Sequence, residues 1–313
     1  MAAQAFRFSD IDGAFEVRAG FPRPNWNVIV EWAETLRDDV NRHELWTEIA
    51  AYWLSKLADT LKNDYAIWES QDFLLLCSRV KAECERLIRY CEKARKQVLG
   101  LLGEIASDGG FGKLVVLLFH DAETYFDYVS DMYPDEGEFG GSGGMFIRDG
   151  YSHIVILAGR VSEPETAIAH ELSHCFLAHL DLPLWLDEGV TQLAELEVAG
   201  RVYVEATREL AMQHRSWWNS DTIQDFWRGG SFSAPDDRQE LSYSLAKTLT
   251  NRLMDQFPDS FEEFVKTASV ADAGDAALWK ACCRSLSQCV SEVLGNQDWS
   301  PRPASWIEED ASK

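Results

Sequence analysis

The amino-acid sequence predicts an α+β fold, in which a small mixed sheet with an antiparallel edge strand packs on one central helix. Three observations lead to this prediction. Long stretches before residue 106 carry apolar side chains three and four apart, which is the spacing of amphipathic helices. Short continuous apolar runs at residues 113–119 and 153–157 are typical of buried strands. Beyond Pro183 the pattern is helical to about residue 294, and strand signals cease.

The chain of 313 residues is long enough for one large domain or two smaller ones. We expect an N-terminal helical segment at residues 1–64 and one further domain at residues 65–313. Within that domain, the sheet and the central helix occupy residues 65–182, and a helical subdomain occupies residues 183–313.

The first elements follow from apolar periodicity. After an irregular opening that Pro22 and Pro24 close, residues 26–62 carry apolar side chains at helical spacing. Residues 65–77 contain two short apolar runs around a polar turn, which predicts a β-hairpin. Residues 80–105 form the cleanest amphipathic pattern of the chain, and we expect one long helix there.

The next segments predict the rest of the sheet. A buried strand at residues 113–119 is followed by a helix near residues 121–133 and by a glycine-rich stretch at residues 137–144. We then expect an edge strand at residues 145–147 and a second buried strand at residues 153–157.

The central helix has a clear beginning and end in the sequence. Ser162 and Glu165 have the spacing of a capping box, and Pro164 suits a first helical turn, so the helix begins near residues 163–165. Pro183 cannot continue a helix, so we expect the end near residues 181–183.

Composition excludes several classes of partner. The formal net charge of −23 argues against nucleic acid or an anionic membrane surface as a partner. No run of about 18 apolar residues predicts a membrane span, and the first residues lack the apolar core of a signal peptide. The seven cysteines show no CxxC spacing and are interpreted as buried free thiols of a cytoplasmic protein.

The segment His170-Glu171-Leu172-Ser173-His174 carries the chemistry of the central helix. Residues four apart lie one helical turn above each other, so both imidazoles can reach one metal ion. Glu171 is placed to hold and deprotonate a metal-bound water, which is the arrangement of zinc hydrolases. With only three fixed positions, this pattern arises by chance in roughly one chain in a hundred of this composition, so its context must decide.

A catalytic zinc ion needs a third protein ligand, and two residues compete for this position. His179 would complete a pattern near that of the metzincins, but the glycine that this pattern requires is absent. In a regular helix, moreover, His179 points away from His170. Glu188 follows a proline turn that can fold a second helix back across the first and return a carboxylate to the metal. The alternative for Glu188 is an ordinary acidic residue near a helix start.

With Glu188 the sequence resembles the gluzincin metallopeptidases, the relatives of thermolysin whose third zinc ligand is a glutamate on the next helix. The phrase PLWLDEGVTQLAE, residues 183–195, is similar to the Trp-Leu-x-Glu-Gly signature of compact bacterial members. The resemblance implies one zinc ion per chain, held by His170, His174 and Glu188, with Glu171 as general base.

The sequence departs from the gluzincin pattern at two points. Only 13 residues separate His174 from Glu188, which demands a tight connection. Gln192 stands where these enzymes often have an acid that orients a ligand histidine. We therefore expect that orientation to be weaker, or to come from Glu195 or a backbone carbonyl.

Two further features of the family have candidates in the chain. The resemblance implies a tyrosine or histidine that stabilises the oxyanion, and Tyr243 is the candidate, with packing at a helix start as the alternative; weaker candidates are Tyr203, Arg238 and His214. It also implies an exposed sheet edge that holds the substrate backbone. Residues 140–147 are the candidate for this edge, with a flexible loop as the alternative.

The expected function is zinc-dependent hydrolysis of peptide bonds in a peptide or protein substrate. Two alternatives remain open. The chain could be an inactive relative that keeps the metallopeptidase fold and acts as a binding or scaffold module, or the histidine motif could be a coincidence. The sequence does not indicate the cleavage specificity or the oligomeric state.

Overall fold

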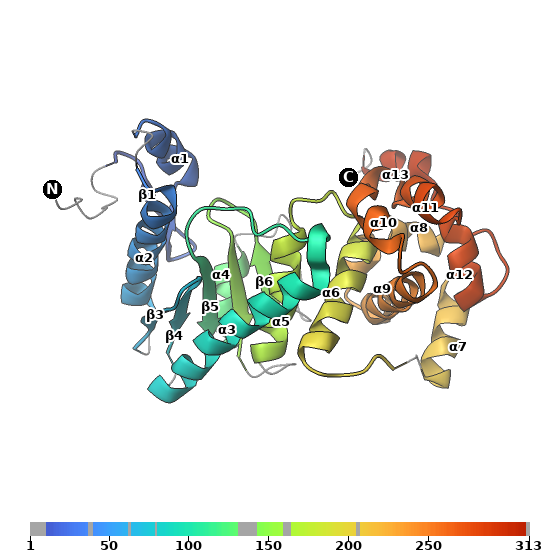
Figure 1. The fold of residues 1–313 in the computed structure, drawn as a ribbon, viewed down its shortest axis with the longest axis horizontal. Coiled ribbons are helices and arrows are strands. Elements are labelled where there is room, and N and C mark those ends of the chain that lie inside the picture. Colours follow the sequence, from blue (N-terminus) through green and yellow to red (C-terminus); the bar gives the residue numbers. More distant parts are fainter. Residues whose placement is uncertain are drawn as a thin grey trace. The chain divides into compact units, whose positions relative to one another are not determined.

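Helices, one larger sheet and one small hairpin make up the described part of the chain in the computed structural model (Figure 1). The described residues are 11–36, 40–61, 64–78, 80–130, 143–158, 164–204 and 207–310. The chain forms two compact units, and the first comprises residues 1–98 and 108–175, whereas the second comprises residues 99–107 and 176–313. The expected α+β class is confirmed, because both helices and a mixed sheet are present.

The larger sheet belongs to the first unit and has five strands in the order β3-β4-β5-β7-β6. Its inner strands β4, β5 and β7 pair in parallel, whereas β3 and β6 pair antiparallel to their neighbours and form the two edges. Side chains of β4 and β7 are buried throughout, as their continuous apolar runs require for strands covered on both faces. The strands are β3 Ala66–Glu69, β4 Phe73–Cys77, β5 Leu114–Phe119, β6 Gly144–Ile147 and β7 His153–Leu157. The predicted hairpin, strands and edge strand are confirmed.

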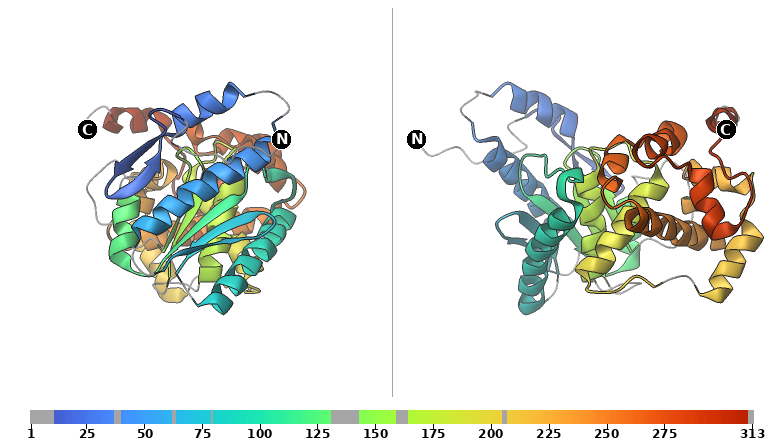
Figure 2. Two further views of the ribbon diagram at one scale, coloured as in Figure 1. Left: turned by 90° about the vertical axis from the view of Figure 1, so that its left-hand side faces the viewer. Right: turned by 45° about the vertical axis from the view of Figure 1, so that its right-hand side comes forward.

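One hydrophobic core covers one face of this sheet. Alternate strand residues such as Leu76, Leu117 and Val155 pack there with side chains of α2, including Trp53. Helix α2 (Arg42–Thr60) crosses this face of the sheet, as the left view of Figure 2 shows. The intervening strand residues face the opposite side, where Ile156 of β7 and Glu171 of helix α5 both lie close to Gly144. The sheet therefore has helices on both faces.

The helical spacing predicted for residues 26–62 corresponds to two helices. Helix α1 (Trp26–Glu34) ends before α2 begins at Arg42. The Asn41 side chain accepts hydrogen bonds from the backbone of His43 and Glu44 and so starts a new helix. Periodicity cannot reveal such a break, since both helices bury apolar stripes.

Residues 15–24 form a hairpin that the sequence prediction missed. Strands β1 (Phe15–Arg18) and β2 (Phe21–Pro24) pair antiparallel. Ala19 and Gly20 connect them and have positive φ angles of 49° and 80°. A two-residue hairpin turn of type I′ requires positive φ at both positions. Pro22 and Pro24 had argued for irregular structure, yet prolines are tolerated in a strand whose N–H groups are not needed for pairing.

The remaining helices that lie wholly or mostly in the first unit follow the prediction more closely. They are α3 (Lys81–Leu102), α4 (Ala122–Ser130) and α5 (Pro164–Leu177). The short turn η2 (Gly103–Ile105), which continues α3, belongs to the second unit. Helix α5 begins at the proline as expected, whereas Ser162 and residues 137–142 of the glycine-rich stretch lie outside the described residues. The helix ends at Leu177, about one turn earlier than expected, because Leu180 N–H bonds to the Leu177 carbonyl in a turn.

The second unit is helical over its described residues, as predicted for residues 183 onward, and the helices continue beyond residue 294 to residue 310. Helix α6 lies against α9. Trp185, Trp227 and Phe264 are among the fully buried side chains of this unit. Trp185 Nε1 donates to the Ala273 carbonyl at 3.0 Å, which fixes the start of α6. The helices are α6 Leu184–Val198, α7 Arg208–Trp217, α8 Thr222–Trp227, α9 Asp237–Gln256, α10 Phe261–Thr267, α11 Asp275–Cys282, α12 Leu286–Leu294 and α13 Pro303–Asp310, with 3₁₀ turns η3 Gly230–Ser233 and η4 Val270–Asp272.

Two whole-chain predictions can be compared with the structure. Among the described helices, none combines the length and the apolar character needed to cross a membrane. None of the seven cysteines, all of which are described, forms a disulfide. Cys77, Cys84, Cys91 and Cys289 are buried as predicted, whereas Cys175 and Cys282 are half-buried and Cys283 is exposed.

Candidate metal centre

His170 and His174 lie one turn apart on α5, and their rings meet edge to face. Their Nε2 atoms are 3.2 Å apart, and their ring centroids are 4.9 Å apart. Two nitrogen ligands of a tetrahedral zinc ion, each about 2.0–2.1 Å from the metal, lie about 3.3 Å from each other. The pair therefore has the spacing that a shared zinc ion requires.

Glu171 lies beside the first residue of the edge strand β6. Its side chain is 7% exposed, and its carboxylate approaches Gly144 on the face of the sheet that α5 covers. The start of α5 is held to α3 by an ion pair between Arg86 and Glu165. Glu171 is thus buried against the sheet, while the two histidines remain half-buried.

Glu188 lies one turn into α6 and is 7% exposed. The Tyr243 hydroxyl of α9 donates to Glu188 Oε1 at 3.4 Å. Gln192 Nε2 donates to the backbone carbonyls of Glu188 at 3.2 Å and of Tyr243 at 3.1 Å. These contacts attach α6 to α9 and restrict the Glu188 carboxylate.

His170 and His174 of the first unit and Glu188 of the second unit offer the donor atoms of a group that could hold a metal ion. In the part of the chain that the structure describes, no other group of three or more histidine, cysteine or acidic side chains could hold a metal ion. Two imidazole nitrogens and one carboxylate oxygen are a donor set that zinc accepts, with a fourth position left for water. The residues present therefore fit a zinc ion.

His179 lies outside this cluster. It follows the end of α5, is exposed, and its Nδ1 lies 3.1 Å from the Phe176 carbonyl. The sequence argument against His179 assumed a helix that stays regular through residue 179, and this assumption is wrong because α5 ends at Leu177. His179 lies in the turn that follows α5 and not on the helix itself, so its position is set by this turn and not by helical periodicity.

The weaker candidates for stabilising the oxyanion, His214, Tyr203 and Arg238, form hydrogen bonds or ion pairs with other residues of the second unit. Trp218 Nε1 donates to His214 Nδ1, so His214 Nε2 carries the proton and donates to Ser244 Oγ at 3.0 Å. Burial lowers the pKa of His214 to about 4. The Tyr203 hydroxyl donates to Thr248 at 3.3 Å, and Arg238 pairs with Asp236 at 2.7 Å. None of the three belongs to the cluster.

Two residues beside the candidate ligands were missed by the sequence analysis. A side chain at Gly144 would meet Glu171, and a side chain at Gly189 would meet Ala246 and Thr250 of α9. Gly144 had been interpreted only as part of a flexible or peptide-binding stretch. The sequence contains no signal for either role, because both depend on neighbours that are distant along the chain.

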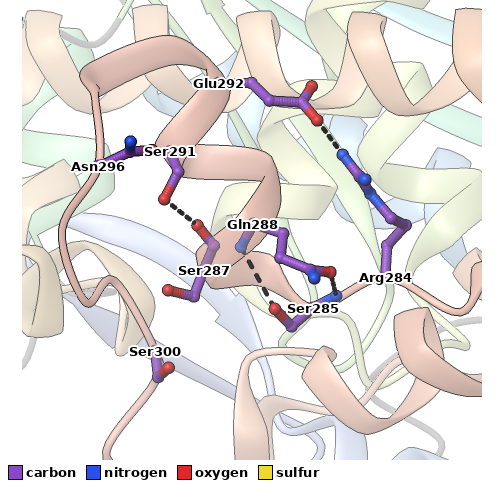
Figure 3. A pocket seen from close by; sticks show the side chains of 8 residues that line it. All are labelled: Arg284, Ser285, Ser287, Gln288, Ser291, Glu292, Asn296 and Ser300. Carbon is purple, nitrogen blue, oxygen red and sulfur yellow. Dashed lines mark hydrogen bonds and ion pairs between the residues drawn. The ribbon is translucent and has the colours of Figure 1, made fainter.

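Two hollows in the second unit lie apart from the candidate ligands. One has a volume of about 580 Å³ and is lined by residues 284–300, among them four serines (Figure 3). Its lining groups bond largely to each other: Ser285 and Gln288 form a capping box, and Arg284 pairs with Glu292. The other, of about 620 Å³, is lined by Leu184 and residues 225–238, among others. Neither includes His170, His174 or Glu188.

No family model matches this chain, and no curated protein sequence matches it. The resemblance to the gluzincins therefore rests on the motif residues and stays a prediction.

Proposed function

We propose that this protein is a zinc-dependent metallopeptidase of the gluzincin type. His170, His174 and Glu188 hold one zinc ion, and Glu171 is the general base. The observation that carries the proposal is the spacing of the His170 and His174 Nε2 atoms, which are 3.2 Å apart, as two ligands of one zinc ion are. Glu188 is the third donor that could complete this group.

The zinc ligands, Glu171 and Tyr243 have different roles in the proposed reaction. A bound zinc ion would acidify a water molecule and polarise the carbonyl of the peptide bond that is cut. Glu171 accepts the proton of the attacking water and passes it to the nitrogen of the leaving amine. Its burial beside β6 keeps the carboxylate in one position. Tyr243 is the candidate that stabilises the oxyanion, and its hydroxyl lies beside Glu188.

The edge strand β6 supports a peptide as the substrate. β6 is the last strand in the sheet order, and its only partner among the described strands is β7. An extended peptide can pair with such an edge through its backbone. Because Glu171 contacts β6 at Gly144, a peptide on this strand would lie near the general base.

Two substitutions test the proposal by separating metal binding from proton transfer. Glu171→Gln should keep one zinc per chain and lose hydrolysis by about 10²–10⁴-fold, because the amide cannot accept the proton. Glu188→Gln should reduce the zinc content to below about 0.2 per chain, because a ligand is lost. Glu197→Gln, at an exposed position of the same helix, is the matched control and should change neither quantity.

Zinc content is measured on protein purified without chelator, and hydrolysis on a peptide library with and without chelator. Wild-type protein without zinc would refute the proposal. Wild-type protein that binds zinc and cleaves no peptide would favour the inactive, scaffold-type relative. Peptide cleavage by Glu171→Gln at the wild-type rate would show that Glu171 is not the base.

A further inference from the structure

We propose that Gly144 is a positioning residue for Glu171: its missing side chain provides the space in which the carboxylate of the general base lies. The inference rests on the proposed function for its catalytic consequence. The space itself is a property of the first unit alone, because Gly144, Ile156 and Glu171 all belong to it.

A side chain at Gly144 would be crowded by Glu171 and Ile156. Gly144 is the first residue of β6 and pairs with Ile156 of β7. A Cβ atom at Gly144 would lie 2.9 Å from Glu171 Oε1, 3.2 Å from Glu171 Cγ and 3.0 Å from Ile156 Cδ1. Real Cβ atoms are rarely this close to other atoms, so one of the two side chains would have to move.

Glu171 is the side chain that would move. Two of the three nearest atoms belong to it, whereas Ile156 is fully buried in a strand with both neighbours in place. A close-packed core side chain resists displacement, and a terminal carboxylate turns about its own bonds at lower cost. The backbone does not oppose an alanine, since Gly144 is not among the glycines with positive φ. Alanine at this position would therefore leave the fold intact and displace the general base.

The consequence for catalysis follows from the position of the carboxylate. A misplacement of about 1 Å at a reacting group can lower the rate by about 10²-fold, because proton transfer requires a short and aligned contact. Zinc binding does not use Glu171, so the metal content should remain unchanged. A side chain that instead blocked a peptide on β6 would weaken substrate binding and raise KM.

The experiment compares Gly144→Ala with Gly143→Ala, whose Cβ would meet nothing within 4 Å. For Gly144→Ala we expect kcat to fall about 10–100-fold, with KM within about twofold, zinc content unchanged and Tm close to that of the wild type. Gly143→Ala should match the wild type in all four measurements. A normal kcat, or an increase confined to KM, would overturn the inference.

A second variant separates Glu171 from Ile156. Ile156→Val removes the Cδ1 atom that the new methyl group would meet, so Gly144→Ala combined with Ile156→Val retains only the clash with Glu171. We expect this double variant to be as slow as Gly144→Ala relative to Ile156→Val alone. Recovery of kcat in the double variant would assign the effect to Ile156 and overturn the inference.

A crystal structure of Gly144→Ala gives a readout that does not depend on activity. We expect the Glu171 carboxylate to be displaced, with the rings of His170 and His174 in their original positions. An unmoved carboxylate would overturn the inference even if the enzyme is a peptidase. If the wild type cleaves no peptide, the proposed function fails, whereas a displaced carboxylate would still show that Gly144 makes room for it.

Discussion

At the scale of single residues, the Tyr243 hydroxyl is the group whose role in the candidate site can be measured most directly. It lies 3.4 Å from Glu188 Oε1, near the long limit of a hydrogen bond, so this contact holds the ligand only weakly. For Tyr243→Phe we expect kcat to fall about 10²-fold, as for the loss of one oxyanion donor, and zinc affinity to change less than tenfold. Kinetics and a chelator competition measure the two effects.

Tyr203→Phe is the matched control for this substitution. It removes a tyrosine hydroxyl that bonds to Thr248 in the same unit, away from the metal cluster. It should leave kcat and zinc affinity unchanged. If Tyr243→Phe lowered zinc affinity more than kcat, its hydroxyl would serve to hold Glu188, and the oxyanion role would be wrong.

At the scale of the elements, the close packing of α6 on α9 places Glu188. Gly189 follows the candidate ligand, and a Cβ there would lie 2.8 Å from the Ala246 carbonyl oxygen and still closer to Thr250 Oγ1. The carbonyl belongs to the helix backbone and cannot turn away. For Gly189→Ala we expect a loss of about 1–3 kcal/mol in the free energy of unfolding, together with weaker zinc binding. Denaturant unfolding and zinc titration measure both.

Gly100→Ala provides the comparison for the helix effect itself. Gly100 lies inside α3, where a Cβ would meet nothing within 4 Å. Alanine there should stabilise the protein by about 0.5–1 kcal/mol, because glycine is a poor helix former. If Gly189→Ala were as stable as Gly100→Ala, the two helices would not be in close contact at Gly189.

At the scale of the whole molecule, one buried neutral histidine in each unit makes stability depend on pH. Burial lowers the pKa of His153 and of His214 to about 4. Both are nearly inaccessible, with exposures of 3% and 4%. In the core, His153 Nδ1 donates to the Tyr151 carbonyl at 2.8 Å, so its Nε2 accepts from the Tyr128 hydroxyl at 2.9 Å. Protonation of either ring in the folded state is therefore opposed.

The sign of the effect follows from proton linkage. Between about pH 6.5 and pH 4 the unfolded chain protonates these rings and the folded chain does not, so stability is complete above this range and falls as the pH falls. Each histidine contributes up to about 3 kcal/mol to this loss. For His214→Gln we expect lower stability than the wild type at pH 7.5 and a smaller difference at pH 4.5. Urea unfolding in the presence of chelator measures it, and a difference independent of pH would contradict the expectation.

The sequence by itself determined the helices and strands whose buried side chains are continuous or recur at a regular spacing. Strands β4, β5 and β7 are continuous apolar runs because both faces of the sheet are covered, and α3 shows a clean stripe because one side of it is buried. The pairing of His170 with His174 is equally local, since a helix alone places residues four apart on one side. The ends of helices and strands were harder to predict from the sequence. The Asn41 cap, the hairpin turn at Ala19 and the early end of α5 each depend on a few hydrogen bonds or backbone angles.

The sequence had singled out Glu188 by its motif, but only the tertiary structure shows how Glu188 is held within the second unit. Gly189 allows α6 to pack closely on α9, and Gln192 bonds to the Tyr243 carbonyl of α9, and no periodicity encodes those contacts. The same holds for Gly144, which looks like a loop residue in the sequence and lies against Glu171 in the fold. A periodic apolar pattern in the sequence shows which side of a helix or strand is buried. The space beside a glycine, in contrast, is bounded by atoms of residues that are distant along the chain, so the local sequence does not reveal it.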